Sequence, residues 1–175
     1  MFSGRALSSC RCRPLSSNVR LHRNHFPVSE PLYFYTKTMP FWGLSNFAPP
    51  GIERQGVYWP TVEHYFQAQK FSEPAARDRI KRAVTPKEAR ALGQSRDYKI
   101  RSDWDVVREQ IMLTGLRLKF KNPEAKTLLL STQDRVLVEA SPFDYFWAAG
   151  QDGTGLNRLG HLLMQVRSEL ARGEA

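Results

Sequence analysis

Signals that begin helices recur along this chain and constrain its fold more than any other feature of the sequence. Short polar side chains cap a helix because they accept hydrogen bonds from its free N–H groups, and proline fits the first turn. The signals are Thr61, Thr85-Pro86, Asp103 and Asn122-Pro123. Together with helical spacing of apolar residues, they predict helices over residues 62–71, 73–83, from 86 onward, 103–120, 124–130 and 156–172.

Strand signals are few and short. Apolar or aromatic runs at residues 32–35, 57–59 and 135–139 predict strands, whereas residues 40–60 are rich in Gly and Pro and favour a loop. A chain of 175 residues with ordinary globular composition can bury one core. We therefore predict an α+β fold, a predominantly helical single domain with a small β-sheet, over residues 32–172.

The N-terminal segment has a different composition. Residues 1–30 hold five of the Arg residues against one acid, Glu30, which accounts for +4 of the formal net charge of +9 and leaves +5 for the rest. We expect residues 1–31 to form a basic, disordered extension. An Arg-rich, Ser-rich, acid-poor segment is also typical of an organelle transit peptide, and an upstream start codon is a further alternative. The expected location is cytoplasmic, or organellar if the segment is a transit peptide.

Several classes of function are excluded or disfavoured. No apolar stretch approaches the roughly 18 residues of a membrane-spanning helix. The only cysteines, Cys10 and Cys12, have a C-x-C spacing that is not typical of zinc sites. We therefore expect no metal, and catalysis must come from carboxylates, histidines or hydroxyls. The net charge alone is weak evidence for nucleic-acid binding, because any basic protein attracts polyanions.

The predicted helix at residues 62–71 carries the most informative side chains. Glu63, Gln67 and Lys70 share one helix face, and Glu63 lies in the first turn, where the helix dipole favours an ionised carboxylate. Such a carboxylate suits the stabilisation of a developing cation or the activation of water. The alternative is that Glu63 only complements the dipole and that Lys70 is a solvated cation. His64 alone favours a packed or surface position.

Three other features have both functional and structural interpretations. Gly153 and Gly155 precede the last helix, where backbone N–H groups can bind an anion or simply form a turn. Tryptophans near loops can stack on a base or belong to the core: Trp42, Trp59, Trp104 and Trp147. A basic cluster can bind an anion or be a solvated patch: Arg96, Lys99 and Arg101.

Taken together, these segments resemble the NADAR (YbiA-like) N-glycosidase family. The string W-P-T-V-E-H-Y-F-Q-A-Q-K-F at residues 59–71 is long and specific. Shorter matches, also in family order, precede it at residues 43–47 and follow it at residues 91–93, 101–104, 119–120, 137–139, 144–147 and 153–160. The resemblance covers about residues 32–170. It implies hydrolysis of an N-glycosidic bond at a ribosyl C1′, without a cofactor.

The resemblance also implies substrates and residue roles. Family members cleave phosphoribosylaminopyrimidine intermediates of riboflavin biosynthesis, releasing ribose 5-phosphate, or remove ADP-ribose from guanine bases. Glu63 matches the essential glutamate, and Asp144 is the expected second catalytic carboxylate, with Glu139 as its rival. Lys70 and Arg101, with N–H groups of the Gly153–Gly155 loop, are expected to hold the phosphate. The full set of expected substrate-binding residues is Asn46, Phe47, His64, Lys70, Arg101, Trp104, Trp147 and Asn157.

Two departures from the family pattern put the substrate in question more than the reaction. Ala148-Ala149 stands where the family usually has Gly-x, and Gln94 stands where a second Arg often follows Gly93. The expected partner is a small phosphoribosyl or ADP-ribosyl substrate, and nucleic acid enters only under the ADP-ribosyl alternative. A non-catalytic nucleotide-binding module is the remaining alternative. The sequence predicts no oligomeric state.

Overall fold

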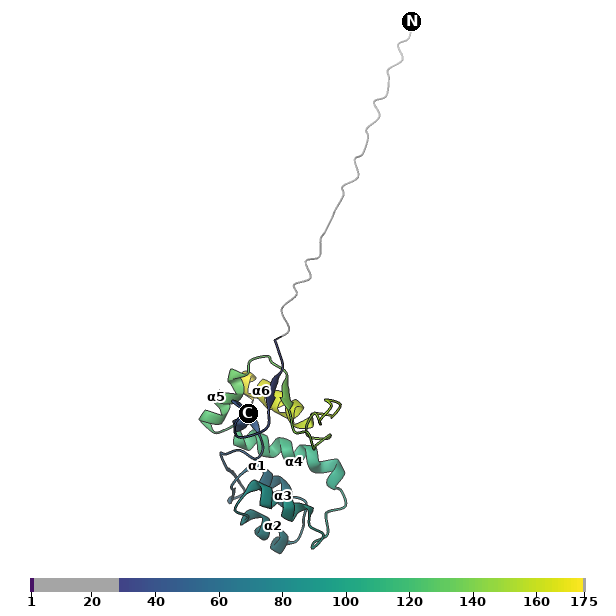
Figure 1. Cartoon of the computed structure of the whole chain (residues 1–175). Helices are drawn as coiled ribbons and strands as arrows, with labels where there is room; N and C mark the ends of the chain where they lie inside the picture. The colour runs from purple at the N-terminus through teal and green to yellow at the C-terminus, as the bar shows by residue number, and fades with distance from the viewer. Residues whose placement is uncertain (2–28, 175) are drawn as a thin grey trace.

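The computed structural model describes Met1 and residues 29–174. Most of the predicted N-terminal extension, including Cys10 and Cys12 and the transit-peptide alternative, therefore lies outside the described residues. The described part contains six α-helices, one short 3-10 helix and four strands (Figure 1). This mostly helical α+β architecture in one domain confirms the predicted fold class.

The helices begin close to the predicted positions. Thr61, Thr85 and Asn122 cap α1, α3 and α5 by accepting hydrogen bonds from backbone N–H groups of the first turn. Asp103 precedes α4 as predicted, but its carboxylate binds the Arg101 guanidinium instead of capping the helix. The helices are α1 Val62–Ala68, α2 Pro74–Lys81, α3 Pro86–Gln94, α4 Trp104–Lys119, α5 Pro123–Ser131 and α6 Arg158–Arg172, and the 3-10 helix is η1 Trp42–Leu44.

The strands form two separate pairs. β1 (Leu32–Phe34) runs parallel to β4 (Leu137–Glu139), although about a hundred residues separate them. β2 (Ile52–Arg54) and β3 (Val57–Trp59) form an antiparallel hairpin. The sequence analysis missed β2, which lies within the Gly- and Pro-rich segment. The hairpin turns at Gln55 and Gly56, whose φ angles of 53° and 73° are the positive pair that a tight two-residue turn requires.

Helix α4 crosses the middle of the molecule (Figure 1). On one side it packs against α1, which also contacts α2 and α3; on the other side it packs against α6, which contacts α5 and β4. Every residue of α1 is buried, including its three polar residues Glu63, His64 and Gln67. Because buried polar side chains need hydrogen-bond partners, those of a helix that is buried on all sides must find them inside the protein. Within the described residues, no helix is long and apolar enough to cross a membrane.

Candidate active site

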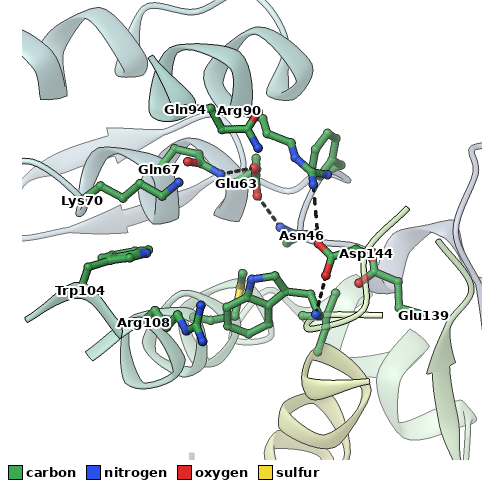
Figure 2. Close-up of a pocket in the computed structure, with 14 residues that line it drawn as sticks. Asn46, Glu63, Gln67, Lys70, Arg90, Gln94, Trp104, Arg108, Glu139 and Asp144 are labelled. Atoms are coloured by element: carbon green, nitrogen blue, oxygen red, sulfur yellow. Dashed lines mark hydrogen bonds and ion pairs between the residues drawn. The ribbon is translucent and has the colours of Figure 1, made fainter. Parts of the chain in front are cut away.

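A cavity of about 190 Å³ lies between α1 and α4 and is also lined by Glu139, Asp144 and Trp147. Figure 2 shows Glu63, Gln67 and Lys70 on one side of the cavity, Trp104 and Arg108 on the opposite side, and Asp144 near Glu139. The lining residues are Asn46, Phe47, Glu63, Gln67, Lys70, Arg90, Gln94, Trp104, Arg108, Met112, Glu139, Asp144, Trp147 and Leu159.

The carboxyl group of Glu63 is held by two amide donors. Gln67, one helical turn further along α1, donates to one carboxylate oxygen at 2.7 Å, and Asn46 donates to the other at 2.5 Å. An ionised carboxylate only accepts hydrogen bonds, so two amide donors favour the ionised form of Glu63. Burial nevertheless raises the pKa of Glu63 from 4.5 to about 7. The prediction from the helix dipole was therefore incomplete, because desolvation of the 3% exposed side chain outweighs the local stabilisation.

A buried lysine fixes the turn that carries Asn46. Lys119, at the end of α4, is fully buried and donates from Nζ to the carbonyls of Ser45 at 2.7 Å and Ala48 at 3.0 Å. Burial lowers the pKa of Lys119 to about 7. A second bond ties the turn to α1, because the Glu63 N–H donates to the Asn46 carbonyl at 3.0 Å. The donor that faces the Glu63 carboxylate is therefore positioned by contacts from both α4 and α1.

Two further carboxyl groups, those of Asp144 and Glu139, line the same cavity as Glu63. One oxygen of Asp144 accepts hydrogen bonds from the N–H groups of Phe146 at 3.0 Å and Trp147 at 2.7 Å. Its other oxygen lies 3.5 Å from the Arg90 guanidinium of α3. Glu139, at the end of β4, lies beside Asp144. Burial, with smaller contributions from the negative charges of Asp144 and Glu63, raises the pKa of Glu139 to about 8.

Aromatic and cationic side chains provide the rest of the lining. The Trp104 and Trp147 rings both pack against Phe66, with ring centroids 5.0 and 5.3 Å from that of Phe66. Lys70 lies just beyond α1, with Nζ 5.6 Å from the centre of the Trp104 ring and 3.1 Å from the Gly93 carbonyl. Burial lowers the pKa of Lys70. The cavity therefore combines carboxyl groups, indole faces and a partly desolvated ammonium group.

Three predicted substrate-binding residues lie outside this cavity. His64 joins α1 to the segment after α2: its Nε2 donates to the Ala83 carbonyl at 3.1 Å, and its Nδ1 lies 2.8 Å from the Thr61 hydroxyl. Arg101 lies on a separate, more open surface and is paired with Asp103. Asn157 supports β4, accepting from the Glu139 N–H at 3.0 Å and donating to the Leu137 carbonyl at 2.8 Å. Arg101 therefore does not line the cavity, although its backbone N–H donates to the carbonyl of the lining residue Lys70 at 2.9 Å.

The glycine loop and the two departures from the family pattern have clear positions. The N–H groups of Thr154 and Gly155 donate to Asp152 and Ala149, so the loop uses them internally rather than for an anion. Positive φ angles occur at Gly150 and Gly153, and not at Ala148 or Ala149, which explains why alanine is tolerated there. Gln94 lines the cavity beside Glu63 (Figure 2), so its departure from the family pattern alters the site itself.

Sequence reasoning missed two cations of the cavity, Arg90 and Arg108. Arg90 lies on α3 and reaches Asp144 from a distant part of the chain, and only the tertiary fold brings them together. Arg108 lies one turn after Trp104 on α4, with its guanidinium 3.7 Å from the centre of the Phe146 ring. The four-residue spacing from Trp104 was a usable signal for Arg108. Among the described residues, no group of three or more His, Cys, Asp or Glu side chains is placed to hold a metal ion.

With this geometry established, comparison with known proteins decides the family. A model of the NADAR domain matches residues 7–171 of the chain. This chain belongs to the NADAR family. The match covers almost all of its length, including the helix that carries Glu63 and the strand that ends at Glu139.

Named relatives match most of the length of this chain. The N-glycosidase Npun_R5314 of Nostoc punctiforme is 46% identical over 143 residues, which are 79% of this chain and 92% of the relative. The N-glycosidase YbiA of Escherichia coli is 43% identical over 155 residues, which are 87% of this chain and 97% of the relative. The chloroplastic riboflavin biosynthesis protein PYRR of Zea mays is 44% identical over 161 residues, 82% of this chain but only 26% of that longer protein.

A solved structure agrees with the fold. The NMR structure of the E. coli protein YbiA superposes with a TM-score of 0.77 at 39% sequence identity, covering 87% of this chain and 92% of the other. The described helices and strand pairs are therefore those of a NADAR-family fold. With relatives named as N-glycosidases, the chain is assigned as a hydrolase that acts on N-glycosyl bonds.

Proposed function

We propose that this enzyme hydrolyses phosphoribosylaminopyrimidine intermediates of riboflavin biosynthesis and releases ribose 5-phosphate. One observation carries the proposal: a buried glutamate held by two amide donors faces a cavity that also contains cations and indole rings. The naming of a relative as a riboflavin biosynthesis protein supports this choice of substrate.

The chemistry follows from the bond that breaks. When the C1′–N bond cleaves, its electron pair leaves with the base and the ribosyl ring develops positive charge. The Glu63 carboxylate stabilises that charge and accepts a proton from the water that attacks C1′. Because the amides of Asn46 and Gln67 hold both of its oxygens, the carboxylate is oriented before the substrate arrives.

The remaining lining suits the other parts of the substrate. Lys70, as predicted, and Arg108, in place of the predicted Arg101, are the lining cations that we assign to the 5-phosphate. Trp104 and Trp147 offer indole faces to the aromatic base. Asp144, which is held by two backbone N–H groups, remains as an acceptor for a ribose hydroxyl.

The proposal is tested by incubating the purified protein with the phosphoribosylaminopyrimidine intermediates and measuring free ribose 5-phosphate. We expect release by the wild type, and a rate about 10²- to 10³-fold lower for Glu63→Gln, because removing a key electrostatic group costs about that much. Arg101→Ala is the matched control outside the cavity and keeps activity. No release by the wild type, or full release by Glu63→Gln, would contradict the proposal.

The same assay separates the two alternatives. An oligonucleotide with ADP-ribosylated guanine serves as a second substrate, and preferential turnover of it, with strong inhibition by salt, would favour the ADP-ribosyl activity. Nucleotide binding without turnover, unchanged by Glu63→Gln, would instead indicate a non-catalytic binding module.

A further inference from the structure

The three carboxyl groups of the cavity have different hydrogen-bond environments. Both oxygens of Glu63 accept from amide groups, and Asp144 accepts from two backbone N–H groups and faces Arg90. The Glu139 carboxyl makes no hydrogen bond or ion pair to any side chain or backbone group among the described residues. Donors to a carboxyl favour its ionised form, so Glu139 is the one of the three that lacks this stabilisation.

The charged groups around Glu139 have opposing effects on its ionisation, and the two carboxyl groups have the larger ones. Asp144 and Glu63 both face it and oppose a further negative charge, whereas Arg90 favours one. Lys37 lines a second, neighbouring cavity that Glu139 also borders. Burial dominates and raises the pKa of Glu139 to about 8, which favours the protonated carboxyl at neutral pH. A neutral carboxylic acid can donate a proton, which neither Glu63 nor Asp144 is arranged to do.

The backbone of Glu139 is held firmly even though its carboxyl is free. Its N–H donates to the Asn157 side chain at 3.0 Å, and its carbonyl accepts from the Ala149 N–H at 2.9 Å. Asn157 is itself packed against Gly160, where an added Cβ would lie 2.5 Å from the Asn157 amide nitrogen. A fixed backbone with an uncommitted carboxyl is the arrangement expected for a group that acts on a bound substrate.

Glu139 also borders a second cavity. This cavity, of about 230 Å³, shares four wall residues with the first: Phe47, Arg90, Glu139 and Asp144. Thr36, Ser45 and Ser141 are among its lining residues, although apolar surface predominates, and the cavity is large enough to admit water. The Glu139 carboxyl can therefore face the substrate on one side and exchange protons with solvent on the other.

We propose that Glu139 is the proton donor to the leaving base. The proposal rests on the N-glycosidase function and adds a second catalytic group to it. As the C1′–N bond breaks, its electron pair stays on the base nitrogen, which takes the proton from the Glu139 carboxyl. Water forms the new C1′–O bond and gives a proton to the Glu63 carboxylate. Glu63 then loses this proton to solvent, and Glu139 regains one through the second cavity, which restores both groups.

The test compares Glu139→Gln with the wild type on two substrates. For the phosphoribosylaminopyrimidine, whose base needs a proton to leave, we expect a fall in kcat of about 10²- to 10⁴-fold. For 4-nitrophenyl ribofuranoside 5-phosphate, whose leaving group departs as a stable anion, we expect the rate to change by less than about threefold, because no general acid is needed. Glu63→Gln is the control that loses activity on both substrates.

A second readout needs only the natural substrate. Because the donor must be protonated, kcat/KM of the wild type falls as the pH rises through about 8, the pKa of Glu139. This alkaline limb disappears in Glu139→Gln. If Glu139 had only a structural role, its substitution would lower the rates of cleavage of both substrates equally, and the alkaline limb of the pH profile would remain.

Two results would overturn the proposal. In the first, Glu139→Gln cleaves the pyrimidine substrate as fast as the wild type does. In the second, Glu139→Gln loses the same factor in kcat on both substrates and keeps the alkaline limb of its pH profile. Failure of the proposed function is a different outcome, in which the wild type does not cleave the pyrimidine. In that case, the ratio of the wild-type rate to the Glu139→Gln rate and the pH profile are measured with the ADP-ribosylated guanine oligonucleotide. The role of Glu139 is then decided independently of the proposed substrate.

Discussion

The two carboxyl-bearing walls of the cavity are built in different ways. The α1 wall, formed by Glu63 and Gln67, rests on an i, i+4 contact within one short helix. The loop wall, formed by Glu139 and Asp144, depends on contacts between distant segments: Arg90 on α3, Asn157 before α6, and the parallel pairing of β4 with β1. The first wall is local in sequence and the second is assembled by the tertiary fold.

This difference has a chemical consequence. The amides of the α1 wall and of Asn46 orient Glu63 as an acceptor, which suits a group that stabilises a cation and activates water. The loop wall places a carboxyl without donors beside two negative neighbours, which suits a group that holds a proton. Substitutions in each wall should therefore change different parts of the reaction.

The largest of the following effects is expected in the loop wall, at Asp144. Asp144→Asn keeps the size of the side chain but removes the charge that faces Arg90 and weakens acceptance from two backbone N–H groups. We expect kcat/KM to fall about 100-fold, the size typical for loss of one well-placed polar group in an active site. Steady-state kinetics measures this. Asp152→Asn, in the exposed loop, is the matched control and keeps wild-type kinetics.

A smaller effect is expected in the α1 wall, at Gln67. Gln67→Leu removes the amide that lowers the pKa of Glu63, so that pKa rises further above about 7. Less of the required carboxylate is then present, and we expect activity at neutral pH to fall about tenfold and to recover partly at higher pH. Gln69→Leu, the same substitution outside the cavity, is the control. An unchanged pH profile for Gln67→Leu would contradict the claim that Gln67 lowers the pKa of Glu63.

The smallest effect is expected at Arg101, which belongs to neither wall. It is paired with Asp103 on a separate surface, so Arg101→Ala should change kcat/KM by less than about twofold. Lys70→Ala, which removes a cation of the cavity itself, provides the contrast and should raise KM. A large increase in KM for Arg101→Ala would restore the sequence-based expectation that this residue holds the phosphate.

Sequence reasoning predicted what is local. The helix caps at Thr61, Thr85 and Asn122 and the spacing of Glu63, Gln67 and Lys70 all depend on residues within a few positions of one another. The raised pKa of Glu63 was not predictable in this way, because burial on all sides of α1 depends on α2, α3 and α4.

What was missed or misplaced depends on long-range contacts. Arg90 could not be assigned to the site, because only the tertiary fold brings it to Asp144. His64 and Asn157 are similar: their side chains bind backbone groups 18 or more positions away, so they support the site rather than line it. Family resemblance placed Glu139 near the site, but its lack of hydrogen-bond donors is visible only in three dimensions.

The central claim is that Glu63 must be a carboxylate when it acts, and the acid side of the pH profile tests this most directly. Because burial raises the pKa of Glu63 to about 7, the account predicts that kcat/KM of the wild type falls about tenfold for each pH unit below that value. The residual activity of Glu63→Gln should lack this limb. A wild-type kcat/KM that stays constant, or rises, as the pH falls below neutrality in an intact protein would contradict the account.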